Sequence, residues 1–472
     1  MTHIVEKIGG TSMSRLNELY HTLFVRNGTP QYGRYFVVSA FGGITNLLLE
    51  HKKSGQPGVY MQLALNADDR GWREALAKTS DAMIAAHGAV LAHPDDIEDA
   101  TAFVQNRIQE TQNCLSDLKR LCSYGGFRLE QQLSRVREML AGLGEMHSAY
   151  SATLFLRRHG VHARFVDLSG WRGKADLKLD DRIRNGIQGI DPNCEMPIIT
   201  GYAQCQNGLM REFDRGYSEV TFSRLAAIVR AKEAVIRKEY HLSSADPLLI
   251  GPSKARKIGH TSYDLADQMA NLGMEAIHPS AARTLRRAKV PLRVTNVFEP
   301  DDPGTLINDI DAETPAVEMI AGLDVVALEV FEQDEIDINL LDVAILNAIG
   351  DHGLRIVSKT INANTITHYI DATLGDIERA AGELAVLYPN AQISTSKFVL
   401  ISVLGRDLEG LSVPARSLQA LAQSSITPVC VLQGSRCVET QLILAAGSLE
   451  TGIRSLHAEF KEDVTNETTI AA

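Results

Sequence analysis

The chain has 472 residues, of which 44% are apolar and 22% charged, and its formal net charge is −11. At about 150 residues per domain this length predicts roughly three domains, and the composition is that of a globular protein. The acidic charge argues against nucleic acid or an anionic membrane as a partner. No apolar run reaches the ~18 residues of a membrane span and no signal-peptide pattern opens the chain, so we expect a cytoplasmic protein. The six cysteines lack C-x-x-C spacing, which favours free thiols.

The opening segment combines a short apolar strand with a glycine turn. After the apolar run at residues 4–8, the chain continues Gly9-Gly10-Thr11-Ser12. A turn of this kind directs backbone NH groups at a phosphate, and Lys7 at the end of the strand would place its ammonium in the same space. Because the lysine precedes the glycines, this is not a Walker loop. The alternative is an ordinary glycine turn beside a surface lysine.

The following segments alternate between strand and helix patterns. Amphipathic helix dominates residues 56–143, and a further helix is expected to begin at Gly144. Short buried strands are predicted at residues 35–40, 163–167 and 196–202. This alternation indicates an α/β fold, a mostly parallel sheet with helices on both faces, in which ligands bind beyond the carboxyl ends of the strands.

A charged cluster precedes the helix expected at residues 222–232. Arg215, Ser218 and Glu219 lie just before this helix. A cation and a carboxylate would thus sit near the free backbone donors of a helix N-terminus.

These segments together resemble the aspartokinases of the amino-acid kinase superfamily, over almost the whole length and in the same order. Each motif alone is weak, but six in register are a strong signal. The matching segments are Val5–Ser12 for V-x-K-F-G-G-T-S, Val37–Asn46 for V-V-S-A-M-G-G-V-T-N, Gly144-Glu145 for G-E, Thr200–Tyr202 for T-G-F, Ala245–Pro247 for T-A-D-P, and Leu272–Pro279 for L-G-A-K-V-L-H-P.

The resemblance implies transfer of the γ-phosphoryl group of ATP, with Mg²⁺, to the side-chain carboxylate of L-aspartate, giving 4-phospho-L-aspartate. Such a reaction brings two anions together, so positioning and charge neutralisation carry most of the catalysis. By the same resemblance Lys7, Arg215 and Glu219 would be catalytic, and Glu145 would accept the α-ammonium of aspartate. The implied ATP and phosphate contacts are Lys7, Gly9, Gly10, Thr11 and Ser12. The implied aspartate pocket consists of Ser39, Ala40, Thr45, Glu145, Tyr202, Arg215 and Ser218.

Several departures from the family pattern fall on the nucleotide side of the site. Glu219 stands where the family has aspartate, residues 237–241 replace T-D-V-D-G, and Glu275 replaces a nucleotide-side lysine. Lys254, Arg256 and Lys257 offer positive charge nearby in sequence. The pattern resembles the divergent aspartokinase branch associated with ectoine synthesis.

The C-terminal third repeats a β-α-β-β-α pattern twice and resembles the paired ACT domains of aspartokinases. We expect a catalytic domain at residues 1–308 and α+β ACT-like domains at 316–396 and 397–472, with segment 309–325 sharing strands with the second of these domains. The resemblance implies a homo-oligomer formed through these domains. Two alternatives stay open, namely a kinase for another acidic amino acid and a catalytically weak or dead amino-acid sensor.

Overall fold

The computed structural model describes residues 3–26, 28, 30–52, 54–65, 69–124, 126–173, 177–213, 216–274, 277–309, 314–333 and 337–462. The chain forms two compact units. The first unit contains residues 1–241 and 277–308, and the second contains residues 242–276 and 309–472. Residues 242–276, which the sequence groups with the catalytic domain, thus pack with the C-terminal part. The predicted limits of the individual domains stay a prediction.

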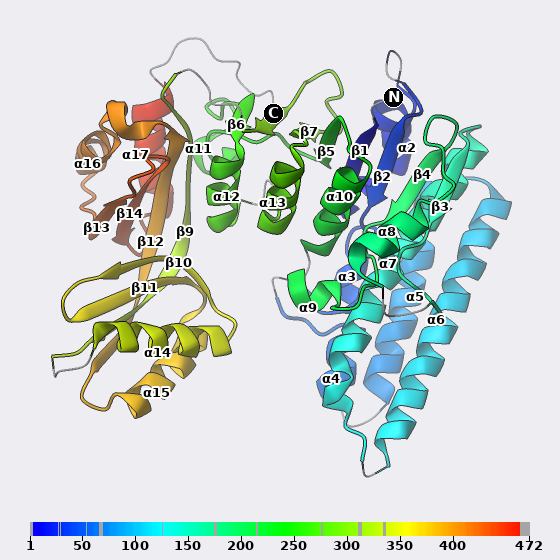
Figure 1. Cartoon of the computed structure of the whole chain (residues 1–472), viewed down its shortest axis with the longest axis horizontal. Helices are drawn as coiled ribbons and strands as arrows, with labels where there is room; N and C mark the ends of the chain where they lie inside the picture. Colours follow the sequence, from blue (N-terminus) through cyan, green and yellow to red (C-terminus); the bar gives the residue numbers. More distant parts are fainter. Residues whose placement is uncertain are drawn as a thin grey trace. The chain divides into compact units, whose positions relative to one another are not determined.

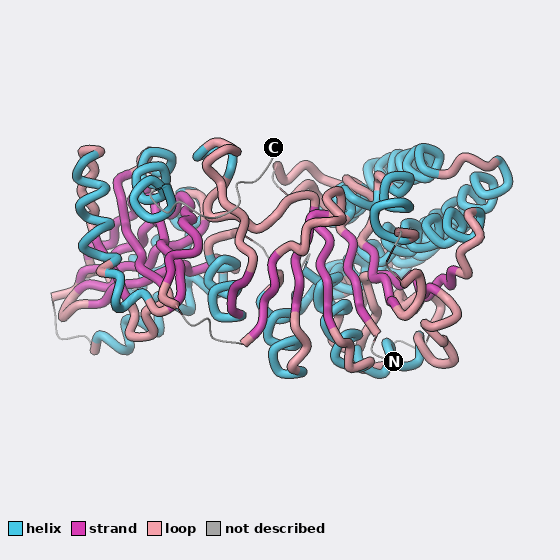
Figure 2. Tube along the Cα trace, turned by 90° about the horizontal axis from the view of Figure 1, so that it is seen from above, coloured by secondary structure: helices cyan, strands magenta, loops and turns pink. Residues whose placement is uncertain are grey.

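The first unit is built on a mostly parallel sheet with helices on both faces (Figure 2). Within this unit the strand order is β3-β4-β2-β1-β5-β7-β8, and the β7–β8 pair is antiparallel. Its strands are β1 (Ile4–Ile8), β2 (Arg34–Val38), β3 (Ala163–Val166), β4 (Met196–Thr200), β5 (Glu233–Lys238), β7 (Leu292–Asn296) and β8 (Thr305–Asn308). The central strands are apolar and almost fully buried, as expected where both faces of a parallel sheet are covered.

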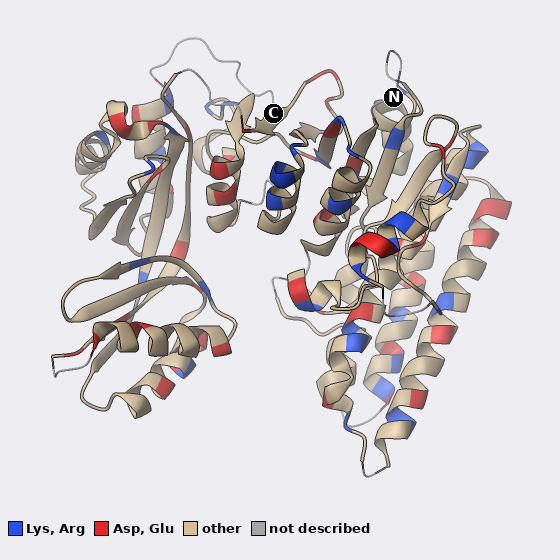
Figure 3. Ribbon diagram, viewed as in Figure 1, with Lys and Arg blue, Asp and Glu red and all other residues tan. Residues whose placement is uncertain are grey.

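The helices of the first unit include three long ones, α5, α6 and α7, which pack against one another (Figure 1). Along α6 the buried positions recur at helical spacing, and apart from the buried Asp96 its acidic and basic residues lie at other positions of the helix (Figure 3). The helical segments are α1 (Gly10–Met13), α2 (Leu16–Leu19), η1 (Tyr20–Phe24), α3 (Ile44–Leu48), α4 (Val59–Leu65), α5 (Arg70–Val90), α6 (Pro94–Cys122), η2 (Leu129–Gln131), α7 (Leu133–Arg158), α8 (Leu179–Gly186), α9 (Leu209–Phe213), α10 (Tyr217–Ile228) and α13 (Pro279–Ala288).

The expectation that a helix begins at Gly144 is wrong, because α7 runs without interruption through this residue. Gly144 serves packing instead. A Cβ atom here would lie 2.9 Å from the Cβ of Ala40 and 3.1 Å from Cγ2 of Ile44. Only glycine lets α7 approach the end of β2 this closely, and the approach brings the neighbouring Glu145 to the carboxyl edge of the sheet.

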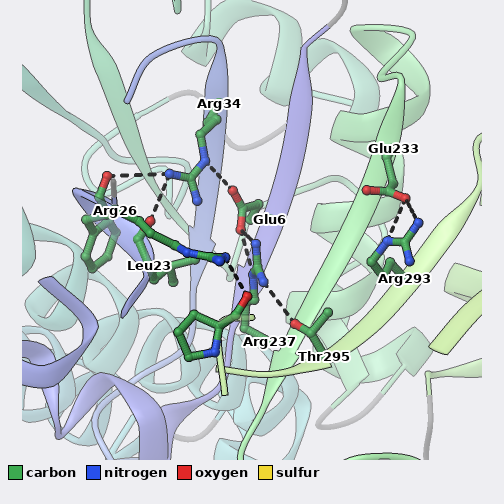
Figure 4. A network of polar contacts seen from close by, with 10 residues as sticks. Glu6, Leu23, Arg26, Arg34, Glu233, Arg237, Arg293 and Thr295 are labelled. Atoms are coloured by element: carbon green, nitrogen blue, oxygen red, sulfur yellow. Dashed lines mark hydrogen bonds and ion pairs between the residues drawn. The ribbon is translucent and has the colours of Figure 1, made fainter. Parts of the chain in front are cut away.

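A buried ion network ties the middle of the sheet together (Figure 4). Glu6 on β1 is 1% exposed and lies between Arg34 on β2 and Arg237 on β5, with contacts of 2.5 and 2.6 Å. Arg34 also donates to the carbonyl of Leu23, and Arg237 to Thr295 Oγ1. Burial alone would raise the pKa of Glu6, but the two guanidinium groups outweigh burial and lower it below its ordinary value.

The second unit contains one six-stranded antiparallel sheet of order β10-β11-β9-β12-β14-β13. The predicted boundary between residues 396 and 397 falls inside β12, which pairs with β9 along almost its full length, so both expected ACT-like modules share these two strands. The elements of this unit are α11 (Pro247–Ile250), β6 (His260–Ser262), α12 (Tyr263–Asn271), β9 (Ala316–Phe331), α14 (Ile338–Asp351), β10 (Arg355–Ile361), β11 (Thr365–Asp371), α15 (Leu374–Leu387), β12 (Gln392–Arg406), η4 (Leu408–Leu411), α16 (Val413–Gln423), β13 (Cys430–Gln433), β14 (Glu439–Ala445), α17 (Leu449–His457) and η5 (Ala458–Glu462). Among the helices that the structure describes, none combines the length and apolarity needed to cross a membrane.

Candidate active site

Lys7 and Glu219 meet at the carboxyl edge of the first unit's sheet. Lys7 is the next-to-last residue of β1, and Glu219 lies in the first turn of α10. The Lys7 ammonium is 3.6 Å from Glu219 Oε1, and each side chain is 14% exposed. Glu219 Oε2 accepts a hydrogen bond from the backbone NH of His278, the N-cap residue of α13. The lysine is therefore held in place and still reaches solvent.

The glycine turn packs tightly against the end of β2. A Cβ atom at Gly10 would lie 2.4 Å from the carbonyl oxygen of Ala40, so this position requires glycine. Gly9 caps the short helix α1, in which Thr11 is exposed and Ser12 is buried. The turn thus lies beside Lys7 at the end of β1, as the sequence predicts.

A carboxylate absent from the predicted site also reaches this turn. Glu239 follows β5 directly, and its Oε1 accepts a hydrogen bond of 2.5 Å from Ser12 Oγ. The same carboxylate oxygen would be 3.8 Å from a Cβ atom on Gly9. An anionic side chain therefore lies against the turn expected to receive phosphate.

Ser39, Ser218 and Glu145 form a hydrogen-bonded chain beside Lys7. Ser39 Oγ donates to Ser218 Oγ at 3.4 Å, and Ser218 Oγ donates to Glu145 Oε1 at 2.6 Å. Ser148 Oγ supports the arrangement by donating to the carbonyl of Ser39. Gly201 permits it, because a Cβ atom there would lie 2.8 Å from the side chain of Ser218.

Glu145 is the carboxyl group of this cluster whose pKa is shifted most from its ordinary value. It is 1% exposed, and its Oε2 has no hydrogen-bond partner among the residues that the structure describes. Burial raises the pKa of Glu145 to about 8, whereas Ser218, the backbone NH of Tyr202 and the Lys7 ammonium act to lower it. A buried carboxyl group with an unused oxygen is suited to accept a cationic ligand group.

Tyr202 connects this cluster with a separate cavity. Its ring is 2% exposed and its hydroxyl donates to Glu138 Oε2 at 2.7 Å. Tyr202 and Glu138 line a cavity of about 550 Å³ that Lys7 and Glu145 do not line. Burial and the Glu138 carboxylate raise the pKa of Tyr202, so the phenol stays protonated. This cavity is therefore a neighbour of the polar cluster and not its centre.

Comparisons with known proteins decide the family. Residues 2–296 match the model of the amino acid kinase family. The aspartate kinase Ask_Ect of Stutzerimonas stutzeri (strain A1501) is 44% identical over 474 residues, covering 100% of both chains. The chain belongs to the aspartate kinases of the amino acid kinase family. The predicted enzyme class is thereby confirmed, and the relative's name agrees with the predicted ectoine branch.

Solved structures show the same fold as this kinase. The crystal structure of Escherichia coli aspartokinase III in complex with aspartate and ADP matches with a TM-score of 0.71 at 18% identity, covering 97% of this chain and 99% of that one. The aspartate kinase of Clostridium acetobutylicum matches with a TM-score of 0.67 at 17% identity, covering 98% and 100%. The predicted fold class, a kinase sheet followed by an antiparallel α+β ACT region, is confirmed.

Most of the predicted site residues that the structure describes follow the carboxyl ends of β1, β2 and β4 or lie in the helices beside them. Ala40 is buried where β2 ends, and Thr45 lies in α3 directly after the glycine pair of that turn. Arg215 lies outside the described residues, as does Glu275. Lys254 belongs to the second unit and pairs there with Glu462.

Sequence reasoning missed three residues that contact the predicted site. Glu239 and Glu138 act through their side chains on Ser12 and Tyr202, and His278 donates its backbone NH to Glu219. Glu239 follows the carboxyl end of a strand, a position where ligand contacts concentrate, and this signal was available in the sequence. The other two depend on pairings between distant segments, which the chain order does not reveal.

Proposed function

We propose that the cluster at the carboxyl edge of the first unit transfers the γ-phosphoryl group of ATP to the side-chain carboxylate of L-aspartate, giving 4-phospho-L-aspartate for ectoine biosynthesis. One observation carries the proposal: the partly exposed Lys7 ammonium and the buried, incompletely bonded Glu145 carboxyl group converge at one sheet edge. The test is ADP release with L-aspartate against L-glutamate, with hydroxylamine trapping the acyl phosphate. Equal turnover of both amino acids would contradict it.

On the phosphate side, Lys7 offsets the negative charge of the transferring group. The Glu219 carboxylate holds the Lys7 ammonium in position. The phosphates lie along the backbone of the turn, residues 9–12. Mg²⁺ carried by the nucleotide would neutralise phosphate charge, and such ions keep several waters and need few protein ligands. Glu219 on α10 and Glu239 after β5 lie beside Lys7 and Ser12 and would be the carboxylates available for outer contacts of that ion.

On the aspartate side, Glu145 accepts the α-ammonium through its unused Oε2. Arg215 grips a substrate carboxylate with its planar fork. Ser39 and Ser218 orient Glu145, and Ala40, Thr45 and Tyr202 complete the pocket. Oppositely charged groups of the substrate are thus bound by two protein groups of opposite sign, which suits the ammonium and a carboxylate of an amino acid.

Aspartate use should depend on the charge of Glu145. Because its pKa is raised to about 8, the carboxyl group of the free enzyme is mostly protonated at pH 6 and becomes anionic as the pH rises. We expect kcat/KM for aspartate to rise by about tenfold per pH unit between pH 6 and 8 and then to level off. In Glu145→Gln this rise should disappear; a wild-type profile flat over this range would remove Glu145 from ammonium binding.

Arg215→Lys should separate the two substrates. A lysine offers a single point charge where the guanidinium forms two parallel bonds to a carboxylate. We expect KM for aspartate to increase at least ~10-fold, with KM for ATP nearly unchanged. Steady-state kinetics with each substrate varied in turn measures both values. An equal increase in both would place Arg215 elsewhere.

L-lysine should bind the ACT region weakly. In lysine-sensitive aspartokinases the strand matching residues 355–360 carries an aspartate, and this chain has the buried Val357 there. The neighbouring Lys359 ammonium binds both oxygens of Asp342, at 2.9 and 2.7 Å, so this carboxylate already has a cation. An ammonium buried without a carboxylate partner costs several kcal/mol. Calorimetry should detect no micromolar lysine binding; micromolar binding with strong inhibition would contradict this expectation.

We propose further that the kinase is cytoplasmic and forms a homo-oligomer through its ACT region. The shared sheet of the second unit supports this, because β10 and β13 are its edge strands and an edge strand is available for pairing with another chain. Light scattering coupled to size-exclusion chromatography should give a dimer or larger assembly. A monomer at micromolar concentration would contradict the proposal.

A further inference from the structure

A second polar cluster follows the carboxyl ends of β5 and β7. His241 follows the end of β5, and Glu299 and Asp302 lie in the loop between β7 and β8. These three residues offer ligand atoms that all lie within 4.8 Å of one another. All three belong to the first unit, and none has a role in the proposed phosphoryl transfer.

The histidine of this cluster lies between two carboxylates. Its side chain is 3% exposed; Nε2 is 2.9 Å from Glu299 Oε2, and Nδ1 is 3.8 Å from Asp302 Oδ1. A carboxylate only accepts hydrogen bonds, so the short contact to Glu299 assigns the proton to Nε2. In the neutral ring Nδ1 then carries a lone pair. This buried atom has no hydrogen-bond partner among the described residues.

The 3.8 Å separation identifies what fits between Nδ1 and Asp302. It is too long for a direct hydrogen bond, so a proton on Nδ1 would join the two groups by charge alone. A metal ion bonded to both atoms at about 2.0–2.2 Å would separate them by roughly 3.0–3.6 Å, so the two atoms would have to approach each other by about 0.2–0.8 Å. A lone pair facing a carboxylate is electrostatically unfavourable, and a cation bound between the two atoms would remove this repulsion.

The neighbouring contacts hold the cluster in this arrangement. Asn296 donates to Glu299 Oε1 at 2.7 Å, and the backbone NH of Gly304 donates to Asp302 Oδ1 at 2.7 Å. Glu299 thus orients the imidazole from its far side, while Asp302 is itself held by the loop. In protein metal sites, one ring nitrogen of a histidine commonly binds the ion while the other donates to a carboxylate, which fixes the tautomer.

We propose that His241 Nδ1 and Asp302 Oδ1 bind a divalent transition-metal cation, with Glu299 as the group that orients His241. Imidazole nitrogen and carboxylate oxygen together suit such cations better than Mg²⁺, which prefers oxygen alone. Water completes the coordination. The cation links the end of β5 to the β7–β8 loop, and none of its proposed ligands is assigned to the Mg²⁺ that would accompany ATP.

The test is titration of the nucleotide-free, metal-stripped full chain with Mn²⁺ by calorimetry and electron paramagnetic resonance. Mn²⁺ is the appropriate probe because the free thiols of this chain would bind the softer Zn²⁺. We expect one tight site. Asp302→Asn keeps the acceptor for the Gly304 NH but removes the charge, and should weaken binding about 10–100-fold. His241→Gln should weaken it similarly, and Glu299→Gln about 10-fold.

His352→Gln is the matched control, because His352 Nε2 also contacts one carboxylate, that of Glu383, at 3.0 Å. It should leave Mn²⁺ binding unchanged. If His241→Gln does not fold, the Mn²⁺ affinity of Asp302→Asn decides the test alone. The thermal midpoint of that variant, measured without metal, shows that it is folded. Absence of a Mn²⁺ site in the wild type, or equal binding by the wild type and Asp302→Asn, would overturn the proposal. Aspartate kinase activity does not enter this test.

Discussion

Lys7→Ala should lower kcat by ~10²-fold or more while leaving the fold intact. The ammonium is the positive group next to the glycine turn, and stabilisation of charge that develops in the transition state commonly contributes this much. The Lys7 ammonium lies 3.6 Å from Glu219 Oε1 and its side chain reaches solvent, so we expect the fold to tolerate its replacement. Single-turnover kinetics at saturating ATP and aspartate measures the effect on the chemical step.

Lys119→Ala provides the control. Lys119 on α6 is 17% exposed and lies 3.6 Å from Asp69, nearly the same burial and pair distance as for Lys7. Lys119 is more than 100 residues from the glycine turn in sequence and lies in one of the three long helices of the first unit. Its replacement should leave kcat within about twofold, as expected for a side chain that makes no transition-state contact. If both variants keep normal turnover, Lys7 has no part in the mechanism.

Glu6→Ala should destabilise the first unit by about 3–5 kcal/mol, because it leaves the buried Arg34 and the largely buried Arg237 without their shared counter-charge. Urea denaturation followed by tryptophan fluorescence measures this directly. The chain has two tryptophans, Trp72 and Trp171, and both belong to the first unit, so the signal reports that unit alone. The midpoint of this transition should fall sharply.

Glu233→Ala is the matched control on the same sheet. Glu233 on β5 pairs with Arg293 at 2.7 Å, but these side chains are 21% and 27% exposed (Figure 4). Its loss should cost about 1 kcal/mol or less, because water replaces the missing partner. Similar decreases in the free energy of unfolding for Glu6→Ala and Glu233→Ala would show that burial does not set the strength of the Glu6 network.

The Glu6 network also has a defined pH dependence. Because the pKa of Glu6 is lowered in the folded chain, its stabilising contribution is complete above the ordinary pKa of 4.5. It is lost as the pH falls through the lowered folded value. The difference in unfolding free energy between the wild type and Glu6→Ala should therefore be constant near neutral pH and shrink in acid.

Local sequence signals determined much of this protein. Short, continuous runs of apolar residues predicted β1 and β2, because a parallel strand that is buried on both faces needs such a run. The glycine pair after each strand marked the sharp turns, and Lys7 fell at the strand end where ligands bind. The family motifs followed from the same positions. All of these signals lie within about a dozen residues, the range over which backbone preference and side-chain pattern decide structure.

Contacts between distant segments were decided only by the tertiary structure. The sequence predicted a helix that begins at Gly144, yet this residue lies within α7 and packs closely against Ala40. Glu239 contacts Ser12 across 227 residues, and β12 crosses an expected domain boundary because β9 pairs with its full length. Such pairings depend on which surfaces meet once the sheets have formed. The sequence therefore specified which groups end each strand, whereas packing specified which of them share one site.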